Sequence, residues 1–420
     1  MPRFDRSHTD DLAAFIEASP TPYHACAEAG RRLEAAGFTR LDEKDAWPAA
    51  DGGYYTVRDG SIIAWRKDGA FDAFRIFGAH TDTPTFKVKP KPDTGFAGWK
   101  QVAVEVYGGV PHQTWLDRDL SVAGRLILRD GTEVLVHVDR PLLRVPRLAI
   151  HLDRGVNEGR ALDPQSQLTP IWGLGQPREG EFLEFIAGEA GVDPDDVLGH
   201  DLFAAALDKP AYLGKDEELF AAWRLDNLTS LHAGVAALIA AGDTGERLPV
   251  LAAFNYEEIG SQTYSAAEGP FLETVLRRIL GSGDVERYAQ TIARSGMMSS
   301  DTGNSIHPNY TEKHDPTHRP IAGGGPMIKV SANQRYASGA EEEALFRRSA
   351  EHAGIPWQYY VNRNSIPGGT TIGPISGTQL GILTVDVGLP ILSMHSAREL
   401  CGAEDPGRLA DLALGLFEHP

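Results

Sequence analysis

An apolar run that ends on two adjacent carboxylates constrains this chain most strongly. Residues 248–254 have the length and composition of a buried strand, and Glu257, Glu258, Gly260 and Ser261 follow closely. In an open α/β sheet the carboxyl ends of the strands border the crevice where ligands bind, so we expect both carboxylates there. One could bind a metal ion while the other takes a proton from a metal-bound water. A solvated Glu-Glu pair in a loop is the alternative, and the pair alone does not decide between them.

A second predicted strand, at 71–78, leads into His80 and Asp82. These two side chains lie on the same side of an extended segment, so Asp82 could orient the imidazole while the imidazole binds a metal. A lone His-x-Asp pair is also common by chance. We expect the strand to form a hairpin with 61–65 through the turn at 67–69, Lys-Asp-Gly.

Three further potential ligands, Asp226, Asp301 and His395, lie at the boundaries of other predicted elements. Asp226 begins a helix with Leu231 and Val235 on its apolar stripe, and is either an N-cap or a metal ligand. Asp301 and His395 each follow an apolar run. Two histidines and several carboxylates suit a pair of zinc-like ions, with one bridging carboxylate and an unligated glutamate as base. No Gly-x-Ser-x-Gly nucleophile motif competes.

The pattern of the chain changes twice, which predicts an inserted domain. Residues 94–216 carry short alternating segments, including a hairpin formed by 124–128 and 134–138. Residues 1–93 and 217–420 have an α/β pattern. We therefore expect an α/β fold in which a central mixed sheet is flanked by helices, with a β-rich domain inserted at 94–216.

Charge and composition exclude several classes of function. The 420 residues include 58 acidic and 40 basic side chains, and the net charge of -18 argues against general binding of nucleic acid or anionic membranes. Two cysteines are too few for a disulfide framework. The N-terminus lacks the apolar core of a signal peptide, and no apolar stretch approaches the length of a membrane span. We expect a cytoplasmic protein that binds neither nucleic acid nor membranes.

Two features of the C-terminal part concern ligands. Lys329 is an isolated lysine in a predicted strand at 327–330, and it is either exposed or a ligand for an acid because burying an unpaired lysine is costly. The glycine-rich segment 367–374 lacks the Gly-Lys-Thr ending of a nucleotide loop, although its backbone could line a site.

A single helix is expected over 271–289.

The whole chain resembles the aspartyl aminopeptidase family of co-catalytic metallopeptidases. The motifs that carry the resemblance occur in family order along the chain. They are Ser19-Pro20-Thr21-Pro22-Tyr23-His24, Gly78-Ala79-His80-Thr81-Asp82, Asp117-Arg118-Asp119-Leu120, Ile150-His151-Leu152, Arg224-Leu225-Asp226-Asn227-Leu228, Glu257-Glu258-Ile259-Gly260-Ser261, His307-Pro308-Asn309-Tyr310, Ile328-Lys329-Val330, Asn333-Gln334-Arg335-Tyr336, Thr371-Ile372-Gly373-Pro374 and Met394-His395-Ser396.

The resemblance implies two divalent metal ions per subunit. His80, Asp226 and Asp301 would hold one ion, and Asp226, Glu258 and His395 the other, with Asp226 bridging them. Zinc is the expected metal, and cobalt or manganese also suits such a mixture of nitrogen and oxygen ligands.

The same resemblance implies roles for five other residues. Glu257 would be the general base, and Asp82 the partner of the metal-binding histidine. Lys329 would pair with the side-chain carboxylate of an N-terminal Asp or Glu, with Tyr336 alongside. The inserted domain would mediate dimerisation, and His151 would reach the active site of the neighbouring subunit. Dimers would assemble into a tetrahedral dodecamer that removes N-terminal residues, preferentially Asp or Glu, from peptides.

The chain departs from the family pattern at two places. Gly303-Asn304 stands where the family has an Ala-His-like pair, and Gly368-Gly369-Thr370-Thr371 replaces Cys-Gly-Ser-Thr. Neither change removes an expected metal ligand, but both bear on the substrate pocket and on how strictly it prefers acidic residues. Two alternatives remain: a metalloaminopeptidase of broader or neutral specificity, and a non-catalytic oligomeric scaffold or cargo protein. A scaffold would need none of the expected ligands.

Overall fold

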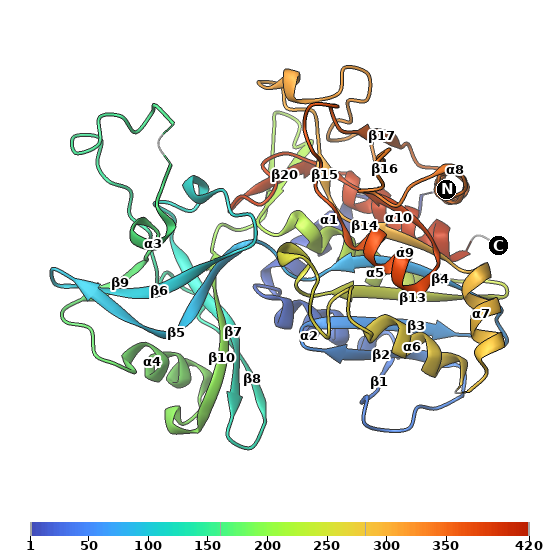
Figure 1. The fold of residues 1–420 in the computed structure, drawn as a ribbon, viewed down its shortest axis with the longest axis horizontal. Coiled ribbons are helices and arrows are strands. Elements are labelled where there is room, and N and C mark those ends of the chain that lie inside the picture. The colour runs from blue at the N-terminus through green and yellow to red at the C-terminus, as the bar shows by residue number, and fades with distance from the viewer. Residues whose placement is uncertain (1, 160, 282, 419–420) are drawn as a thin grey trace. The chain divides into compact units, whose positions relative to one another are not determined.

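The structure is a computed structural model that describes residues 2–159, 161–281 and 283–418 (Figure 1). Contacts divide the chain into two units. The first, the sheet unit, comprises Met1–Asp82, Pro210–Met394 and Glu399–Pro420. The second, the inserted unit, comprises Thr83–Lys209 and His395–Arg398.

A nine-stranded mixed sheet forms the centre of the sheet unit (Figure 1). In spatial order its strands are β1 (Thr39–Arg40), β2 (Gly52–Arg58), β3 (Ser61–Lys67), β13 (Arg247–Phe254), β4 (Ala73–His80), β14 (Gly296–Ser300), β18 (Leu383–Gly388), β16 (Met327–Val330) and β17 (Gln358–Val361). The four strands β13, β4, β14 and β18 are parallel to one another. Their carboxyl ends therefore meet at one edge, and the predicted fold class, a mixed sheet flanked by helices, is confirmed.

The predicted hairpin between β3 and β4 is wrong, because β13 lies between these two strands. Val250 of β13 pairs with Trp65 of β3 on one side and with Ile76 of β4 on the other. Residues 248–254 are all buried, and such a strand needs a neighbour on each edge and cover on both faces. Local turn chemistry at 67–69 was therefore overridden by a pairing that is distant in sequence.

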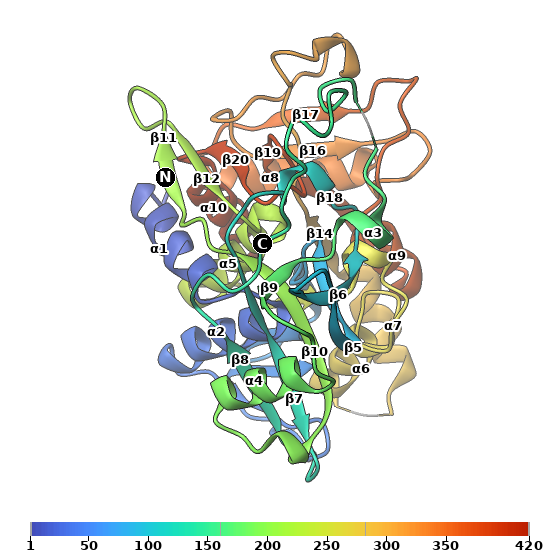
Figure 2. The ribbon, with the colours of Figure 1, turned by 90° about the vertical axis from the view of Figure 1, so that its left-hand side faces the viewer.

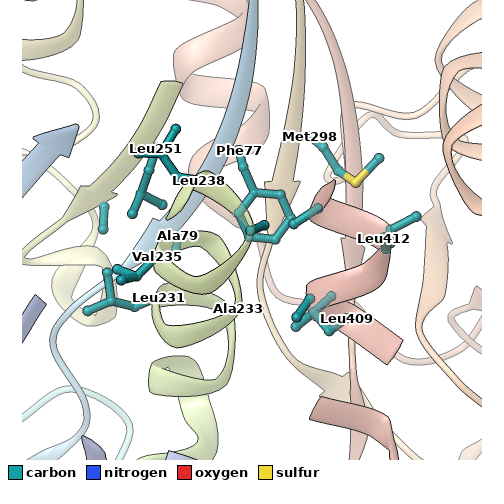
Figure 3. Packing of buried hydrophobic residues seen from close by; sticks show 14 of the residues in the cluster. Phe77, Ala79, Leu231, Ala233, Val235, Leu238, Leu251, Met298, Leu409 and Leu412 are labelled. Atoms are coloured by element: carbon teal, nitrogen blue, oxygen red, sulfur yellow. The ribbon is translucent and has the colours of Figure 1, made fainter. Parts of the chain in front are cut away.

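Helices cover both faces of this sheet. One face carries α1 (Arg6–Glu17), α2 (Pro22–Ala35), α5 (Leu225–Ala240), α8 (Ala340–Ala353) and α10 (Asp405–Glu418). Figure 3 shows Leu231 and Val235 of α5 and Leu409 of α10 in the same buried cluster as Phe77 and Leu251 of the sheet. The other face carries α6 (Phe271–Leu280), α7 (Val285–Arg294) and α9 (Ile372–Leu380). Alternate residues of β13 and β4 thus enter two separate cores, as the period of two along a strand requires.

The single helix expected over 271–289 is wrong, because α6 and α7 are separate helices. Gly281 ends α6 with a φ of 79°, a conformation that glycine adopts at little cost. Asp284 then caps α7 by accepting the N–H of Arg287 at 2.9 Å.

The inserted unit contains a six-stranded antiparallel sheet (Figure 2). In spatial order its strands are β8 (Glu133–His137), β7 (Leu120–Leu128), β10 (Val197–Ala206), β5 (Thr85–Phe96), β6 (Trp99–Tyr107) and β9 (Ile171–Leu174). Its helices are α3 (Pro164–Gln167) and α4 (Glu181–Ala190). The predicted hairpin of 124–128 and 134–138 is confirmed by the pairing of β7 with β8.

The bounds of the inserted unit differ from the predicted 94–216. The unit starts at Thr83, because β5 pairs with β10 and β6 rather than with the nine-stranded sheet. It stops at Lys209, because β11 (Ala211–Leu213) and β12 (Leu219–Ala222) form a small sheet with β20 (Glu399–Gly402) of the sheet unit.

The remaining elements are short. A two-stranded sheet joins β15 (Gly303–Asn304) to β19 (Pro390–Ile391), and 3-10 turns occur at His112–Thr114, Pro194–Asp196, Glu257–Ile259 and Thr311–Lys313. Among the described residues, no helix combines the length and apolar character needed to cross a membrane.

Candidate metal centre

Three neighbouring strands bring potential ligands to one edge of the sheet. His80 is the last residue of β4, Asp301 directly follows β14, and Glu257 follows β13. Phe254 at the end of β13 is paired in register with His80. Parallel pairing therefore brings together side chains that are distant in sequence, where the strand-end pattern predicts a site.

The imidazole of His80 is surrounded by carboxylates. Its Nε2 lies 3.1 Å from Asp226 Oδ1, 3.5 Å from Asp301 Oδ1 and 4.0 Å from Glu257 Oε2. His80 is only 1% exposed. Burial alone would lower the pKa of His80, but its hydrogen bonds to Asp226, Asp301 and Asp82 raise that pKa well above the ordinary value.

The donor atoms fit a divalent metal ion. Those of His80, Asp226 and Asp301 lie within 4.8 Å of one another, and so do those of His80, Glu257 and Glu258. An imidazole nitrogen with carboxylate oxygens is a donor set that zinc accepts. Carboxylates that converge in a buried site repel one another, and a bound cation offsets that repulsion.

Asp82 connects the imidazole to the turn that carries both glutamates. Its Oδ1 lies 3.4 Å from His80 Nδ1 and accepts the N–H of Glu257 at 3.1 Å. Its Oδ2 accepts the N–H of Glu258 at 3.1 Å. One buried carboxylate therefore orients the histidine and the backbone of the Glu257-Glu258 turn together.

Left-handed backbone conformations shape this turn. Tyr256 has a φ of 68° and Gly260 a φ of 99°, on either side of the 3-10 turn Glu257–Ile259. The N–H of Ser261 donates to the carbonyl oxygen of Tyr256 at 2.8 Å and closes the turn. Gly260 is suited to its position because glycine has no side-chain penalty there.

The environment of Glu257 favours its protonated form. Burial raises the pKa of Glu257, the charge of His80 opposes this, and nearby Asp301, Asp82 and Asp226 raise the pKa further. The ionised form is the one that can take a proton, and a divalent cation held by the neighbouring ligands would favour that form by its charge.

Asp226 is positioned by a hydrogen bond from its own backbone N–H and by one from the side-chain amide of its neighbour Asn227. Asp226 and Asn227 begin α5 with non-helical conformations. The N–H of Asp226 donates to Glu399 Oε2 at 2.9 Å, and Asn227 Nδ2 donates to the carbonyl oxygen of Ser300 at 2.8 Å. Of the two interpretations of Asp226, the approach of its carboxylate to His80 favours the ligand. Glu399 was missed by the sequence analysis, and its single local signal is an acidic residue in an otherwise apolar strand.

Lys329 is buried beside Asp301. Its Nζ donates to the carbonyl oxygen of Thr302 at 2.6 Å, lies 3.5 Å from Asp301 Oδ2 and is 5.4 Å from the centre of the Tyr336 ring. The lysine is 2% exposed. Burial lowers the pKa of Lys329, but the charges of Asp301, Tyr336, Asp386 and Asp226 together raise it above its ordinary value, so the side chain stays charged. Of the two alternatives for Lys329, an exposed side chain or a ligand for an acid, exposure is therefore wrong.

Gly303 and Asn304, the first departure from the family pattern, lie beside this lysine. A Cβ at Gly303 would collide with the methyl group of Met327 and lie 3.3 Å from Lys329 Cε, so a larger residue would displace both side chains. Asn304 Nδ2 donates to the hydroxyl of Tyr360 at 3.4 Å.

His395 and His151, unlike the other predicted site residues, belong to the inserted unit. His395 Nδ1 lies 3.2 Å from the carbonyl oxygen of Gly109. His151 occupies an exposed turn between two exposed apolar residues, Ile150 at 50% and Leu152 at 75%.

Comparisons with known proteins agree with this chemistry. Residues 15–417 match the family model of the aminopeptidase I zinc metalloproteases (M18). The chain is 54% identical over 428 residues to a probable M18 family aminopeptidase 2 of Streptomyces coelicolor, covering 100% of this chain and 99% of that protein. It matches a chain in the cryo-EM structure of the Ape4 and Nbr1 complex with a TM-score of 0.94 at 34% identity, covering 98% of this chain and 85% of that chain. For the mApe1 dodecamer of S. cerevisiae the TM-score is 0.85 at 26% identity, covering 99% and 97%. This chain therefore belongs to the aminopeptidase I zinc metalloprotease (M18) family.

Proposed function

We propose that this aminopeptidase uses two divalent metal ions to release N-terminal residues, preferentially Asp or Glu, from peptides. The observation that carries the proposal is the convergence of Asp226, Asp301 and Glu257 on the buried imidazole of His80. A scaffold protein has no need of such a cluster, whose mutual repulsion costs stability unless a cation is bound.

The ligands divide between two ions. His80, Asp226 and Asp301 would hold the first, and Asp226, Glu258 and His395 the second, so that Asp226 bridges. The convergence of donor atoms supports the first set. The assignment of His395, which belongs to the inserted unit, rests on the resemblance of its surrounding motif to the aspartyl aminopeptidase family. Zinc suits these donors and is the metal of the family.

Glu257 would move the proton of the reaction. When bound, the metal ions would polarise the scissile carbonyl and lower the pKa of a water molecule. Glu257 would take the proton of that water at Oε2 and return it to the amine that leaves. Asp82 would hold Glu257 in place through the backbone N–H that it accepts at 3.1 Å.

Lys329 would provide the preference for acidic residues. It is a buried cation beside Asp301, and an ammonium group with three donors can bind a substrate carboxylate in addition to the carbonyl oxygen of Thr302. Tyr336 would form the adjoining wall. The same contacts favour a second candidate, an aminopeptidase without acidic preference, because Lys329 already has an anionic partner within the protein.

We also propose that the inserted unit joins subunits into dimers within a larger homo-oligomer. The mApe1 dodecamer is a structural relative of the chain over nearly its whole length. Leu148, Ile150 and Leu152 are each at least 50% exposed, a cluster of apolar side chains that a second copy would cover. His151, which lies among them, would then reach the active site of the neighbouring subunit.

Peptide hydrolysis by metal-depleted and reconstituted protein tests the proposal. Wild type and Glu257→Gln would be supplied with zinc, cobalt or manganese, and release of the N-terminal residue from Asp-, Glu- and Leu-peptides would be measured. Acid-selective release that the variant loses supports the full assignment. Release of N-terminal residues by wild type without preference for Asp or Glu would support the mechanism and contradict the role of Lys329 as a pocket for acidic side chains. No release by folded wild type with any of the metals would favour the non-catalytic scaffold.

A further inference from the structure

Asp386 is a fully buried carboxylate that the proposed mechanism does not use. It lies in β18, between β14 and β16, and is paired in register with Ser299. Burying an ionisable group costs free energy unless hydrogen bonds compensate. The partners of Asp386 therefore indicate its role.

The two oxygens of Asp386 bind two different segments. Oδ2 accepts the N–H of Ala337 at 2.6 Å, and Oδ1 accepts the hydroxyl of Thr371 at 2.6 Å. The backbone N–H of Asp386 also donates to Ser338 Oγ at 3.1 Å. Residues 331–339, around Ala337, and residues 367–371, the part of the glycine-rich segment before α9, are neither helix nor strand, so side-chain bonds help to fix their positions.

The first segment leads to the surroundings of Lys329, and the second is tied to the first because Thr370 Oγ1 donates to the carbonyl oxygen of Arg335 at 3.4 Å. Tyr336 directly precedes the amide that Asp386 binds, and its ring centre lies 5.4 Å from Lys329 Nζ. Thr371 is the N-cap of α9 and accepts the N–H of Gly373 at 3.3 Å. Gly373 approaches Asp386 so closely that a Cβ there would collide with the carboxylate. The start of α9 therefore packs directly against the carboxylate of Asp386.

We infer that Asp386 is a positioning residue for the pocket that receives the side chain of the first substrate residue. Its hydrogen bonds hold Tyr336 beside Lys329 and fix the end of the glycine-rich segment at the same strand. The inference rests on the proposed function, in which that pocket selects acidic residues. Without the carboxylate, the partly buried N–H of Ala337 loses its acceptor and the pocket wall shifts. Misplacement of a positioning group by a fraction of an ångström to an ångström is enough to lower selectivity.

Two substitutions at Asp386 separate geometry from charge. Asp386→Ala should lower kcat/KM for Asp- and Glu-peptides about tenfold, mainly through KM, and change that for Leu-peptides less than about threefold. Asp386→Asn should restore most of the loss, because its amide oxygen can accept from Ala337 while its NH2 group donates to Thr371. Equal losses on all peptides, or an Asn variant as impaired as the Ala variant, would overturn the inference.

Thr371 supplies a second test if Asp386→Ala does not fold. Thr371→Val removes the hydroxyl and should lower the acidic-to-neutral ratio, whereas Thr371→Ser keeps the hydroxyl and should keep the ratio. Thr384→Val is a matched control. Thr384 lies in β18 with Asp386, and its buried hydroxyl donates to the carbonyl oxygen of Ile382 at 3.0 Å rather than to Asp386. The same ratio in Thr371→Val and Thr371→Ser would contradict the inference.

Amide hydrogen exchange reports the anchoring without substrate. Exchange in 331–339 should be faster in Asp386→Ala than in wild type and in Asp386→Asn. A wild-type enzyme without acidic preference would contradict the proposed function but not the anchoring by Asp386. The exchange rate of residues 331–339 would then be the test of that anchoring. Exchange in Asp386→Ala that equals that of wild type would overturn the role of Asp386. If wild type is acid-selective, faster exchange in Asp386→Ala without a change in its acidic-to-neutral substrate ratio would also overturn that role.

Discussion

The ammonium group of Lys329 lies 3.5 Å from Asp301 Oδ2, so the proposed specificity residue directly contacts a proposed metal ligand. This contact allows two roles for Lys329. It can attract an acidic substrate side chain, or it can orient Asp301 for every substrate. The two roles predict different substrate profiles for one variant.

Lys329→Met should lower kcat/KM for Asp- and Glu-peptides by about 10- to 100-fold, the value of one hydrogen bond to a charged group. Hydrolysis of Leu-peptides serves as the internal control and should change less than about threefold. Steady-state kinetics on the three peptides distinguish the two roles of Lys329. A uniform loss would show that Lys329 acts through Asp301 and that the acidic preference has another source.

Glu257→Gln and Glu258→Gln should differ although the residues are adjacent. We expect Glu257→Gln to lose about 10²- to 10⁴-fold in kcat and to keep its bound metal, because Glu257 is the proposed base rather than a ligand. Glu258→Gln should lose metal. Elemental analysis after dialysis, together with kcat, separates the two, and metal loss in Glu257→Gln would contradict the assignment.

Asp82→Asn should weaken metal binding about 10- to 100-fold. Asp82 accepts the N–H groups of both Glu257 and Glu258, and an asparagine offers one acceptor oxygen where two are needed. Competition with a chromophoric chelator measures the affinity without reference to turnover. An unchanged affinity would show that the turn holds its conformation without Asp82.

Acid should destabilise the protein partly through His8. Its ring lies 4.4 Å from that of His232, and burial, with the charge of His232, lowers the pKa of His8 from 6.5 to about 2. The unfolded chain binds a proton at His8 as the pH falls below 6.5, whereas the folded protein does not. The contribution of His8 to stability is therefore complete above pH 6.5 and is lost as the pH falls toward 2.

His8→Phe should flatten this acid dependence by up to about 1.4 kcal/mol per pH unit below pH 6. Urea unfolding at pH 7.5, 6.0 and 5.0 compares the variant with wild type. Parallel pH profiles for the two proteins would show that His8 does not contribute to the loss of stability in acid.

The parts of the site that follow strand ends could be predicted from sequence. His80, Glu257 and Asp301 each follow an apolar run, and parallel pairing brings such ends to one edge whatever the strand order. The strand order itself could not be predicted, because β13 enters between β3 and β4 from far along the chain. A local turn signal carries no information about such an insertion.

Residues that act by positioning other residues could not be predicted from the sequence either. Glu399 has its role because it accepts the N–H of Asp226, and Asp386 because it binds Ala337 and Thr371. These bonds depend on the folded arrangement, and no local spacing indicates them. The predicted partner of His80, Asp82, could be found because it lies two residues away on the same side of an extended segment.

The order of the strands also sets when the site is completed during synthesis. β4, with His80 at its end, leaves the ribosome early, but both of its neighbours in the sheet, β13 and β14, are translated long after it. The nascent chain therefore carries His80 and Asp82 without Asp226, Glu257 and Asp301, the carboxylates that approach the imidazole Nε2 in the finished protein. The proposed metal centre would therefore be completed only after most of the chain is translated, and a truncated product that ends before β14 would lack Asp301.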